Sequence, residues 1–306
     1  MITVLCGGVG AAKMLRALRL VVDGSELTGI VNNGDDLTLH GLRICPDLDT
    51  ITYTLAGLNN QETGWGLTDE SWRVMKELSE LGGASWFGLG DRDLATHLYR
   101  TERLRQGDSL NEITRDLLAH FGVDITLLAA TQDPIATVFE TVEHGNLSFQ
   151  EYFVLHHHDV VVTSIDILGA QKARPSQGVL EAMANAERIV ISPSNPLISI
   201  GPILALPGIR ETLMARRSDV VVISPLIGGK ALKGPADRLM EELGLSATSR
   251  GVASYYREIA STLIIDNSDS ADRSSVEAEG MRCIVTPTIM SDDVVSANLA
   301  EVVLHG

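Results

Sequence analysis

The chain has 306 residues, of which 44% are hydrophobic and 21% are charged, a balance that excludes wholesale disorder and supplies a sizeable core. The 40 acidic residues against 24 basic ones give a net charge of −16, and such a field repels nucleic acid and anionic membranes, so neither is an expected partner. No apolar run approaches the roughly 18 residues of a membrane span, the first residues lack the basic start of a signal peptide, and the three cysteines form no CxxC pair. We therefore expect a cytoplasmic protein without a disulfide framework or a zinc site.

The beginning of the chain has the pattern of a strand, a tight turn and a helix. An apolar strand at residues 2–6 is followed by Gly-Gly-Val-Gly at 7–10 and an amphipathic run at 11–22. A second apolar strand at 27–31 ends in Asn-Asn-Gly-Asp-Asp at 32–36. Because one helix joins the two strands, they are predicted to be parallel neighbours with a right-handed crossover.

The rest of the chain predicts a helical segment followed by further strands and helices. Helical spacing between approximately residues 50 and 122 indicates an insertion, with helices at 71–81, 92–103 and 109–121. A strand is expected at 124–130, a β-hairpin at 137–142 and 147–154, and strands buried on both faces at 159–168, 188–192 and 219–224. Helices at 178–186 and 208–215, strands at 262–266 and 283–286, and a final helix from 291 complete the pattern. We expect a single α/β domain over residues 1–306, a doubly wound, mostly parallel Rossmann-like sheet with a helical insertion and a β-hairpin.

The glycine loop at residues 7–10 is the first candidate for chemistry. Glycines allow a phosphate to approach the backbone, and the following helix offers free N–H groups and Lys13. Met14 stands where a Walker A loop needs Ser or Thr, and Lys13 replaces the third glycine of the dinucleotide fingerprint. The loop therefore indicates an anion site of another kind, or a tight turn without a ligand.

Carboxylates near the end of the second strand are the next candidates. Asp47 and Asp49 follow Pro46, at the edge of the sheet where ligands of α/β proteins bind. Carboxylates in such a place suit Mg²⁺, which prefers one or two of them together with substrate phosphates. The alternative is that Asp49 caps a helix and Asp35 a turn.

Further polar loops follow other predicted strands. Arg92 is a possible phosphate ligand, although Asp91 also suits a helix cap. The loop at 192–196 carries Ser194 and Asn195 between prolines, and a Gly-Gly-Lys run ends at Lys230, with Lys233 close behind. These groups are suited to a polar or anionic ligand.

Taken together, the motifs resemble the 2-phospho-L-lactate transferase family of coenzyme F-420 biosynthesis. The resemblance covers essentially the whole chain and is carried by the segments at 7–13, 33–36, 46–50, 89–97, 149–153, 193–196 and 233–236. It implies an enzyme that joins the deazaflavin Fo to a phospho-hydroxyacid taken from its guanosine diphosphate ester, such as a phospholactate or phosphoenolpyruvate group, and releases GMP. Mg²⁺ as cofactor and a homodimer are implied as well.

The resemblance also assigns candidate site residues. The deazaflavin would contact Asp49, Thr50, Gly88, Asp91 and Arg92. The guanosine diphosphate part would contact Gly8, Gly10, Lys13, Ser194, Asn195, Gly229 and Lys230. We expect Asp47 and Asp49 to hold the metal, and Asp49, Lys13 and Arg92 to be catalytic: Asp49 would orient or accept the hydroxyl proton, and the two cations would stabilise the transition state.

Two other functions are compatible with parts of the pattern. An NAD(P)-dependent dehydrogenase would bind its cofactor at residues 7–10, but the third glycine and a base for hydride transfer are missing. A regulatory protein of the gluconeogenesis-factor group would bind a nucleotide sugar on a similar core. The segments at 46–50 and 90–97 favour the transferase.

Overall fold

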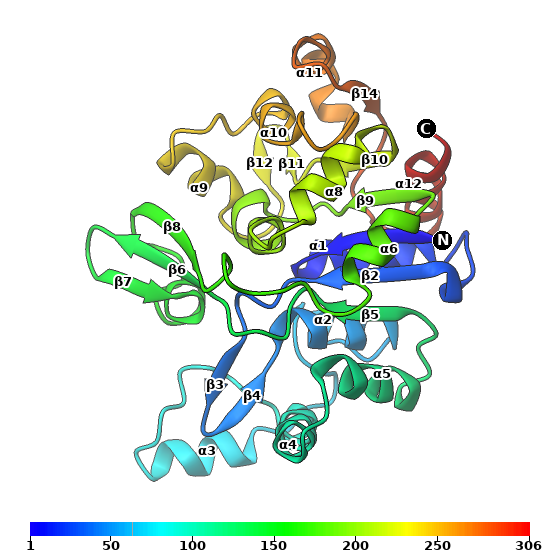
Figure 1. Ribbon diagram of the computed structural model, residues 1–306. Coiled ribbons are helices and arrows are strands. Elements are labelled where there is room, and N and C mark those ends of the chain that lie inside the picture. The colour runs from blue at the N-terminus through cyan, green and yellow to red at the C-terminus, as the bar shows by residue number, and fades with distance from the viewer. Residues whose placement is uncertain (63) are drawn as a thin grey trace.

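A seven-stranded parallel sheet forms the centre of the computed structural model, which describes residues 1–62 and 64–306 (Figure 1). Its strand order is β14-β13-β10-β9-β1-β2-β5. In that order the bounds are Arg282–Val285, Thr262–Ile265, Val220–Ile223, Arg188–Ile191, Ile2–Cys6, Leu27–Val31 and Thr126–Ala129. The chain starts in the middle of the sheet, winds outward through β2 and β5, and then returns to β9 on the other side of β1, which is the Rossmann order. The predicted fold class is confirmed.

Helices cover both faces of this sheet and enclose two apolar layers. In β1, Val4 and Cys6 pack into one layer and Leu5 into the other, since successive side chains of a strand point to opposite faces. The first layer is closed by α1 (Gly8–Leu18), α2 (Pro46–Leu55), α5 (Leu110–His120) and α12 (Asp293–His305). The second is closed by α6 (Val179–Asn185), α7 (Gly201–Leu204), α8 (Ile209–Ala215), α9 (Ala236–Glu242), α10 (Ser249–Tyr256) and α11 (Arg273–Ala278).

A small antiparallel sheet projects from the molecule, at the left of Figure 1. It has the order β7-β6-β8, with β6 at Ala136–Thr141, β7 at Gly145–Ser148 and β8 at Val162–Leu168. The predicted hairpin is confirmed, although residues 151–155 form a short π-helix instead of prolonging its second strand. The placement of residues 159–168 as a strand buried on both faces was wrong: β8 pairs with β6 outside the central sheet, and the polar side chains of Thr163, Ser164 and Asp166 interrupt its apolar run.

The segment between β2 and β5 is mostly helical, as expected, and lies at the bottom of Figure 1. It contains the short hairpin of β3 (Leu37–Leu39) and β4 (Leu42–Ile44), then α2, α3 (Arg73–Glu80), α4 (Asp91–Gln106) and α5. Ile44, Met75, Leu89 and Leu94 form a separate small core in this segment. The β3–β4 hairpin and the start of α2 at Pro46 were not predicted, and α2 places Asp47 and Asp49 in a first helical turn.

Among the described residues, no single helix is long and apolar enough to cross a membrane, and only the pair Pro196–Leu204 and Ile209–Ala215, bent by 93°, meets length and composition limits together.

Candidate active site

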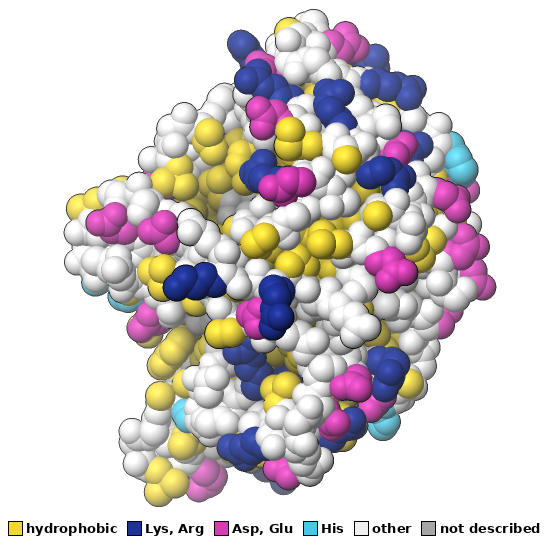
Figure 2. All heavy atoms as spheres, viewed as in Figure 1, with side chains coloured by type: hydrophobic (Ala, Val, Ile, Leu, Met, Phe, Trp, Pro, Cys, Tyr) yellow, Lys and Arg dark blue, Asp and Glu magenta, His cyan; other side chains and the backbone are white. Residues whose placement is uncertain are grey.

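A cavity of about 700 Å³ lies at the carboxyl edge of the central sheet. The loops that follow β1, β9 and β10 line it, together with residues of the helical segment and of the small sheet. Because the chain winds outward in opposite directions from β1 and β9, this edge is the topological switch point at which doubly wound proteins bind their ligands. On the face drawn in Figure 2, Lys and Arg are interspersed with Asp and Glu, without a continuous basic area.

The structure brings most of the predicted site residues into this cavity. Its wall includes Gly8, Gly10, Lys13, Asp47, Asp49, Thr50, Gly88, Ser194 and Asn195. The wall does not include four of the predicted site residues, namely Asp91, Arg92, Gly229 and Lys230.

The glycine loop is shaped by close packing between the chain segments that leave β1 and β9. A Cβ atom at Gly10 would stand 2.2 Å from the carbonyl oxygen of Pro193, and one at Gly7 would stand 2.6 Å from Cβ of Ser199. The hydroxyl of Ser194 donates to the carbonyl oxygen of Gly7 at 2.6 Å. Both glycines are therefore required by the fold itself, before any ligand is considered.

Asp35 and Asp47 form a pair of buried carboxylates in the cavity wall. One amide group, Nδ2 of Asn32, donates to both, at 3.2 Å to Asp35 and 3.0 Å to Asp47, and the backbone N–H of Gly8 donates to Asp47 at 2.8 Å. Burial raises the pKa of Asp47 to about 7, although the hydrogen bonds that it accepts from Asn32 and Gly8 oppose the shift. Burial, followed by the charges of Asp47 and Asp36, raises the pKa of Asp35 well above its usual range. Neither carboxylate forms an ion pair with any residue the structure describes, so no cationic side chain compensates their charge when they ionise.

Asp49 has a different environment, because it forms a buried ion pair with Arg100. The guanidinium donates from Nη1 to Oδ2 of Asp49 at 3.1 Å and from Nη2 to Oδ1. Burial disfavours the charged form of Arg100, but the charge of Asp49 outweighs this effect and keeps the pKa of Arg100 above its ordinary value. The ion pair thus holds the Asp49 carboxylate in one orientation.

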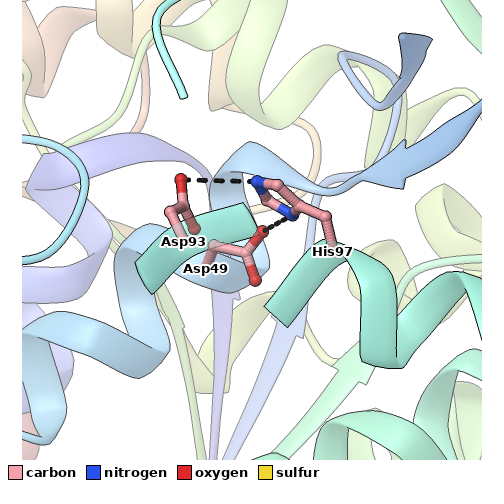
Figure 3. A group of neighbouring side chains, drawn as sticks. All are labelled: Asp49, Asp93 and His97. Atoms are coloured by element: carbon pink, nitrogen blue, oxygen red, sulfur yellow. Dashed lines mark ion pairs between the residues drawn. The ribbon is translucent and has the colours of Figure 1, made fainter. Parts of the chain in front are cut away.

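His97 lies between Asp49 and Asp93, and Figure 3 shows its ring directed toward both carboxylates. Nη1 of Arg100 is 3.3 Å from Nδ1 of His97. Since a guanidinium can only donate, Nδ1 is the acceptor in this contact, and Nε2 lies 3.3 Å from Oδ2 of Asp93. The hydroxyl of Tyr53 donates to Asp93 at 2.7 Å. Burial alone would raise the pKa of Asp93, but the contacts to His97 and Tyr53 outweigh it and hold that pKa below its usual range.

These side chains come from matching faces of two helices. Asp49 and Tyr53 are one turn apart on α2, and Asp93, His97 and Arg100 follow one face of α4. The sequence predictions assigned no role to Tyr53, Asp93, His97 or Arg100. The helical spacing of Asp93, His97 and Arg100 is the sequence signal that could have identified these three residues.

Metal binding has two candidate positions in this arrangement. Asp49, Asp93 and His97 offer ligand atoms that all lie within 4.8 Å of one another. However, Asp49 and Nδ1 of His97 already face the Arg100 cation. The pair of Asp35 and Asp47 has no cationic partner among the described residues, and a divalent cation there would favour the ionised form of both carboxylates.

Asp91 and Arg92 have local structural roles at the start of α4. Asp91 accepts from the hydroxyl of Ser71 at 2.5 Å and from the N–H groups of Arg73 and Val74, so it caps α3. The helix-cap alternative expected it to cap the helix that follows, but Asp91 is itself the first residue of α4. The exposed guanidinium of Arg92 donates to the carbonyl oxygen of Thr68 at 2.5 Å.

The Gly-Gly-Lys run at residues 228–230 forms a hairpin turn. Gly228 and Gly229 have positive φ angles of 60° and 73° and join β11 (Leu226–Ile227) to β12 (Lys230–Ala231). The exposed Lys230 is not part of the cavity wall, and the lysine of this region that lines the cavity is Lys233.

Aromatic side chains form a second part of the cavity wall. Tyr53, Trp65 and Phe87 come from the helical segment, and Phe149 and Phe153 come from the small sheet and its π-helix. The rings of Phe149 and Phe153 are stacked, with centroids 5.5 Å apart. Such walls are suited to a flat, ring-containing ligand.

The Rossmann-like sheet has a large cavity at its switch point, where carboxylates meet side chains that can bind a phosphate. This combination defines an α/β enzyme that acts on small molecules. The model of the family "2-phospho-L-lactate transferase CofD" matches residues 2–294, and the chain belongs to this family of transferases.

Curated relatives agree with this assignment. A protein from Kitasatospora aureofaciens named phosphoenolpyruvate transferase is 43% identical, over 99% of this chain and 96% of its own length. A protein from Methanosarcina acetivorans named 2-phospho-L-lactate transferase is 39% identical, over 98% of this chain and 97% of its own. A solved structure of a upf0052-family protein from Bacillus halodurans has a TM-score of 0.62 and 15% identity, over 99% of this chain and 98% of its own, and so shares the fold.

Proposed function

We propose that the protein transfers a phospho-hydroxyacid group from its guanosine diphosphate ester to the deazaflavin Fo, in coenzyme F-420 biosynthesis. A hydroxyl oxygen of Fo attacks the phosphorus that bears the acid, the bond from this phosphorus to the GMP oxygen breaks, and GMP leaves with the bonding electrons. The observation that carries the proposal is a single cavity that joins an edge of anion-binding groups to a compartment with aromatic walls. The names of the relatives support a phospholactate or phosphoenolpyruvate group.

The anion-binding edge is assigned to the guanosine diphosphate part. Lys13 is exposed on α1 and lines the cavity, and Nδ2 of Asn195 is buried there without a hydrogen-bond partner among the described residues. A diphosphate oxygen would satisfy both groups. The deazaflavin is assigned to the aromatic compartment, with Thr50, Gly88 and Asp49 beside it.

Mg²⁺ fits the pair of Asp35 and Asp47, two buried carboxylates that form no ion pair with any of the residues described. We therefore retain Asp47 as a metal ligand and put Asp35 in the place first expected for Asp49. When bound, the ion would neutralise charge on the nonbridging phosphate oxygens.

The chain's own residues are assigned to orientation and charge stabilisation. Asp49, held by Arg100, would accept a hydrogen bond from the attacking hydroxyl and orient its oxygen toward phosphorus. Lys13 would stabilise negative charge on the leaving GMP. Arg92 has no part in this scheme, because its side chain is outside the cavity wall. The homodimer and the cytoplasmic location remain part of the proposal, with family membership as their support.

The proposal is tested by incubating the purified protein with Fo, Mg²⁺ and the guanosine diphosphate esters of lactate, enolpyruvate and glycerate in turn. Mass spectrometry should detect GMP and a deazaflavin phosphodiester with at least one donor. A folded protein that gives no product with any donor, or that binds a uridine diphosphate sugar in preference to all three, would overturn it.

A further inference from the structure

Lys233 is a second cation in the cavity, separate from Lys13. Among the described residues these two lysines are the only Lys or Arg side chains in the cavity wall. The same wall carries the carboxylates of Asp35, Asp47, Asp49 and Asp93. A substrate with several negative charges therefore meets positive side chains at only two places.

Lys233 reaches the cavity from the loop between β12 and α9 and extends toward the helical segment. Its Nζ lies 2.8 Å from the position that a Cβ atom of Gly64 would take, next to Trp65 and Gly66 of the cavity wall. The following residue, Gly234, has a φ of 72° and turns the chain against the ring of Phe153. The ammonium group of Lys233 thus lies beside the helical segment, while the next residue of its loop contacts the π-helix of the small sheet.

The ammonium group of Lys233 has no hydrogen bond or ion pair with any residue in the described part of the chain. It is also exposed, so the fold does not need it for packing. A lysine that lines a cavity of acidic character without a partner there is available to an anionic group of a ligand.

The two acids named by the relatives share one anionic group besides the phosphate. Both 2-phospholactate and phosphoenolpyruvate carry a carboxylate on the carbon atom that bears the phosphate oxygen. In the proposed arrangement Lys13, Asn195 and a metal ion account for the diphosphate, and no other cationic side chain of the described wall is left for the carboxylate.

We infer that Lys233 binds the carboxylate of the transferred acid and so selects donors that carry one, an inference that rests on the proposed function. Lys233 would be a specificity-determining residue, whose loss affects acid donors and spares donors in which the carboxylate is absent. A charged hydrogen bond of this kind discriminates by about 10- to 100-fold.

The test compares two donors, the guanosine diphosphate ester of the preferred acid and the same ester with a carboxamide in place of the carboxylate. For the native protein, kcat/KM should fall by about 10- to 100-fold with the carboxamide. Lys233→Met should turn over both donors at nearly equal rates, chiefly through a higher KM for the acid. Lys230→Met is the matched control, because Lys230 lies three residues away outside the cavity wall and should keep the native discrimination.

A Lys233→Met variant that still discriminates as the native protein does would overturn this inference and leave the proposed function intact. Lys233→Arg should retain discrimination, since it keeps the charge, and equal loss in both variants would also contradict the assignment. Absence of product from the native protein with every acid donor would instead overturn the proposed function, and this inference with it.

Discussion

The guanidinium of Arg100 donates to both carboxylate oxygens of Asp49, and the two side chains are 1% and 9% exposed. The residues are 51 positions apart in the chain, on α4 and α2. This ion pair fixes Asp49 in the cavity wall as a charged group with a defined direction. It also connects α4 to α2, one of the helices that cover the central sheet.

Removal of Arg100 should destabilise the protein strongly. Arg100→Met leaves Asp49 as a buried charge without its partner, which costs about 3–5 kcal/mol of unfolding free energy. Urea unfolding followed by circular dichroism measures this. Arg105→Met, an exposed position at the end of the same helix, is the control and should change stability by less than about 0.5 kcal/mol. Equal stability of the two variants would show that the ion pair is dispensable.

Asp49→Asn should lower turnover by a factor on the order of 100 or more, because the neutral amide orients the attacking hydroxyl less well and cannot accept its proton. Steady-state rates of GMP release, at saturating concentrations of both substrates, measure the effect. Far-ultraviolet circular dichroism controls for folding. A near-normal rate in a folded variant would remove Asp49 from the reaction.

Lys13→Ala should raise the KM for the donor or lower kcat by roughly 10-fold or more, since the charge that meets the diphosphate is lost. Arg16→Ala is the matched control on the same helix: the Arg16 side chain is exposed, pairs with Asp293 and lies outside the cavity wall. Unchanged kinetics in Lys13→Ala would leave this lysine without a role in donor binding.

The pKa of Asp47 predicts how stability depends on pH when no divalent cation is added. Burial raises this pKa from 3.8 to about 7, so the folded protein binds the proton more tightly than the unfolded chain does. The contribution to stability is fully present below about pH 4 and is lost as the pH rises through about 7.

Urea unfolding between pH 4 and pH 8 should therefore include a component that falls with pH and disappears in Asp47→Asn. Mg²⁺ that binds Asp47 would favour the charged form and restore stability near pH 8. A native protein and an Asp47→Asn variant with parallel pH profiles would contradict this prediction.

Gly10→Ala should destabilise the fold by about 1–3 kcal/mol, because the new Cβ atom would overlap the backbone carbonyl of Pro193. The melting temperature measured by calorimetry should drop accordingly. At Gly88 a Cβ atom would meet only ordinary contacts at 3.5 Å, so Gly88→Ala provides the comparison. If both variants melt alike, the close approach of the two loops is not a constraint on Gly10.

Local sequence patterns were sufficient for the strands of the central sheet, most helices and the general position of the site. Runs such as Ile2–Cys6 and Val220–Ile223 are apolar and β-branched because they are buried on both faces, and glycine-rich or polar loops follow them at the carboxyl edge. These signals depend on neighbouring residues only. The same reasoning put residues 159–168 in the wrong sheet, because strand pairing depends on residues distant in the sequence.

The sequence by itself determined that acids, glycines and lysines occur at the ends of these strands, and hence that the carboxyl edge carries the site. Only the tertiary structure decided which of these groups are free to meet a ligand. Asp49 forms an ion pair with Arg100, whereas Asp35 and Asp47 have no such partner among the described residues. Lys233 lines the cavity, whereas Lys230 follows a hairpin turn and is not part of the cavity wall. Charge compensation depends on contacts across 50 or more positions, and such contacts exist only once α2, α4 and the central sheet have packed together.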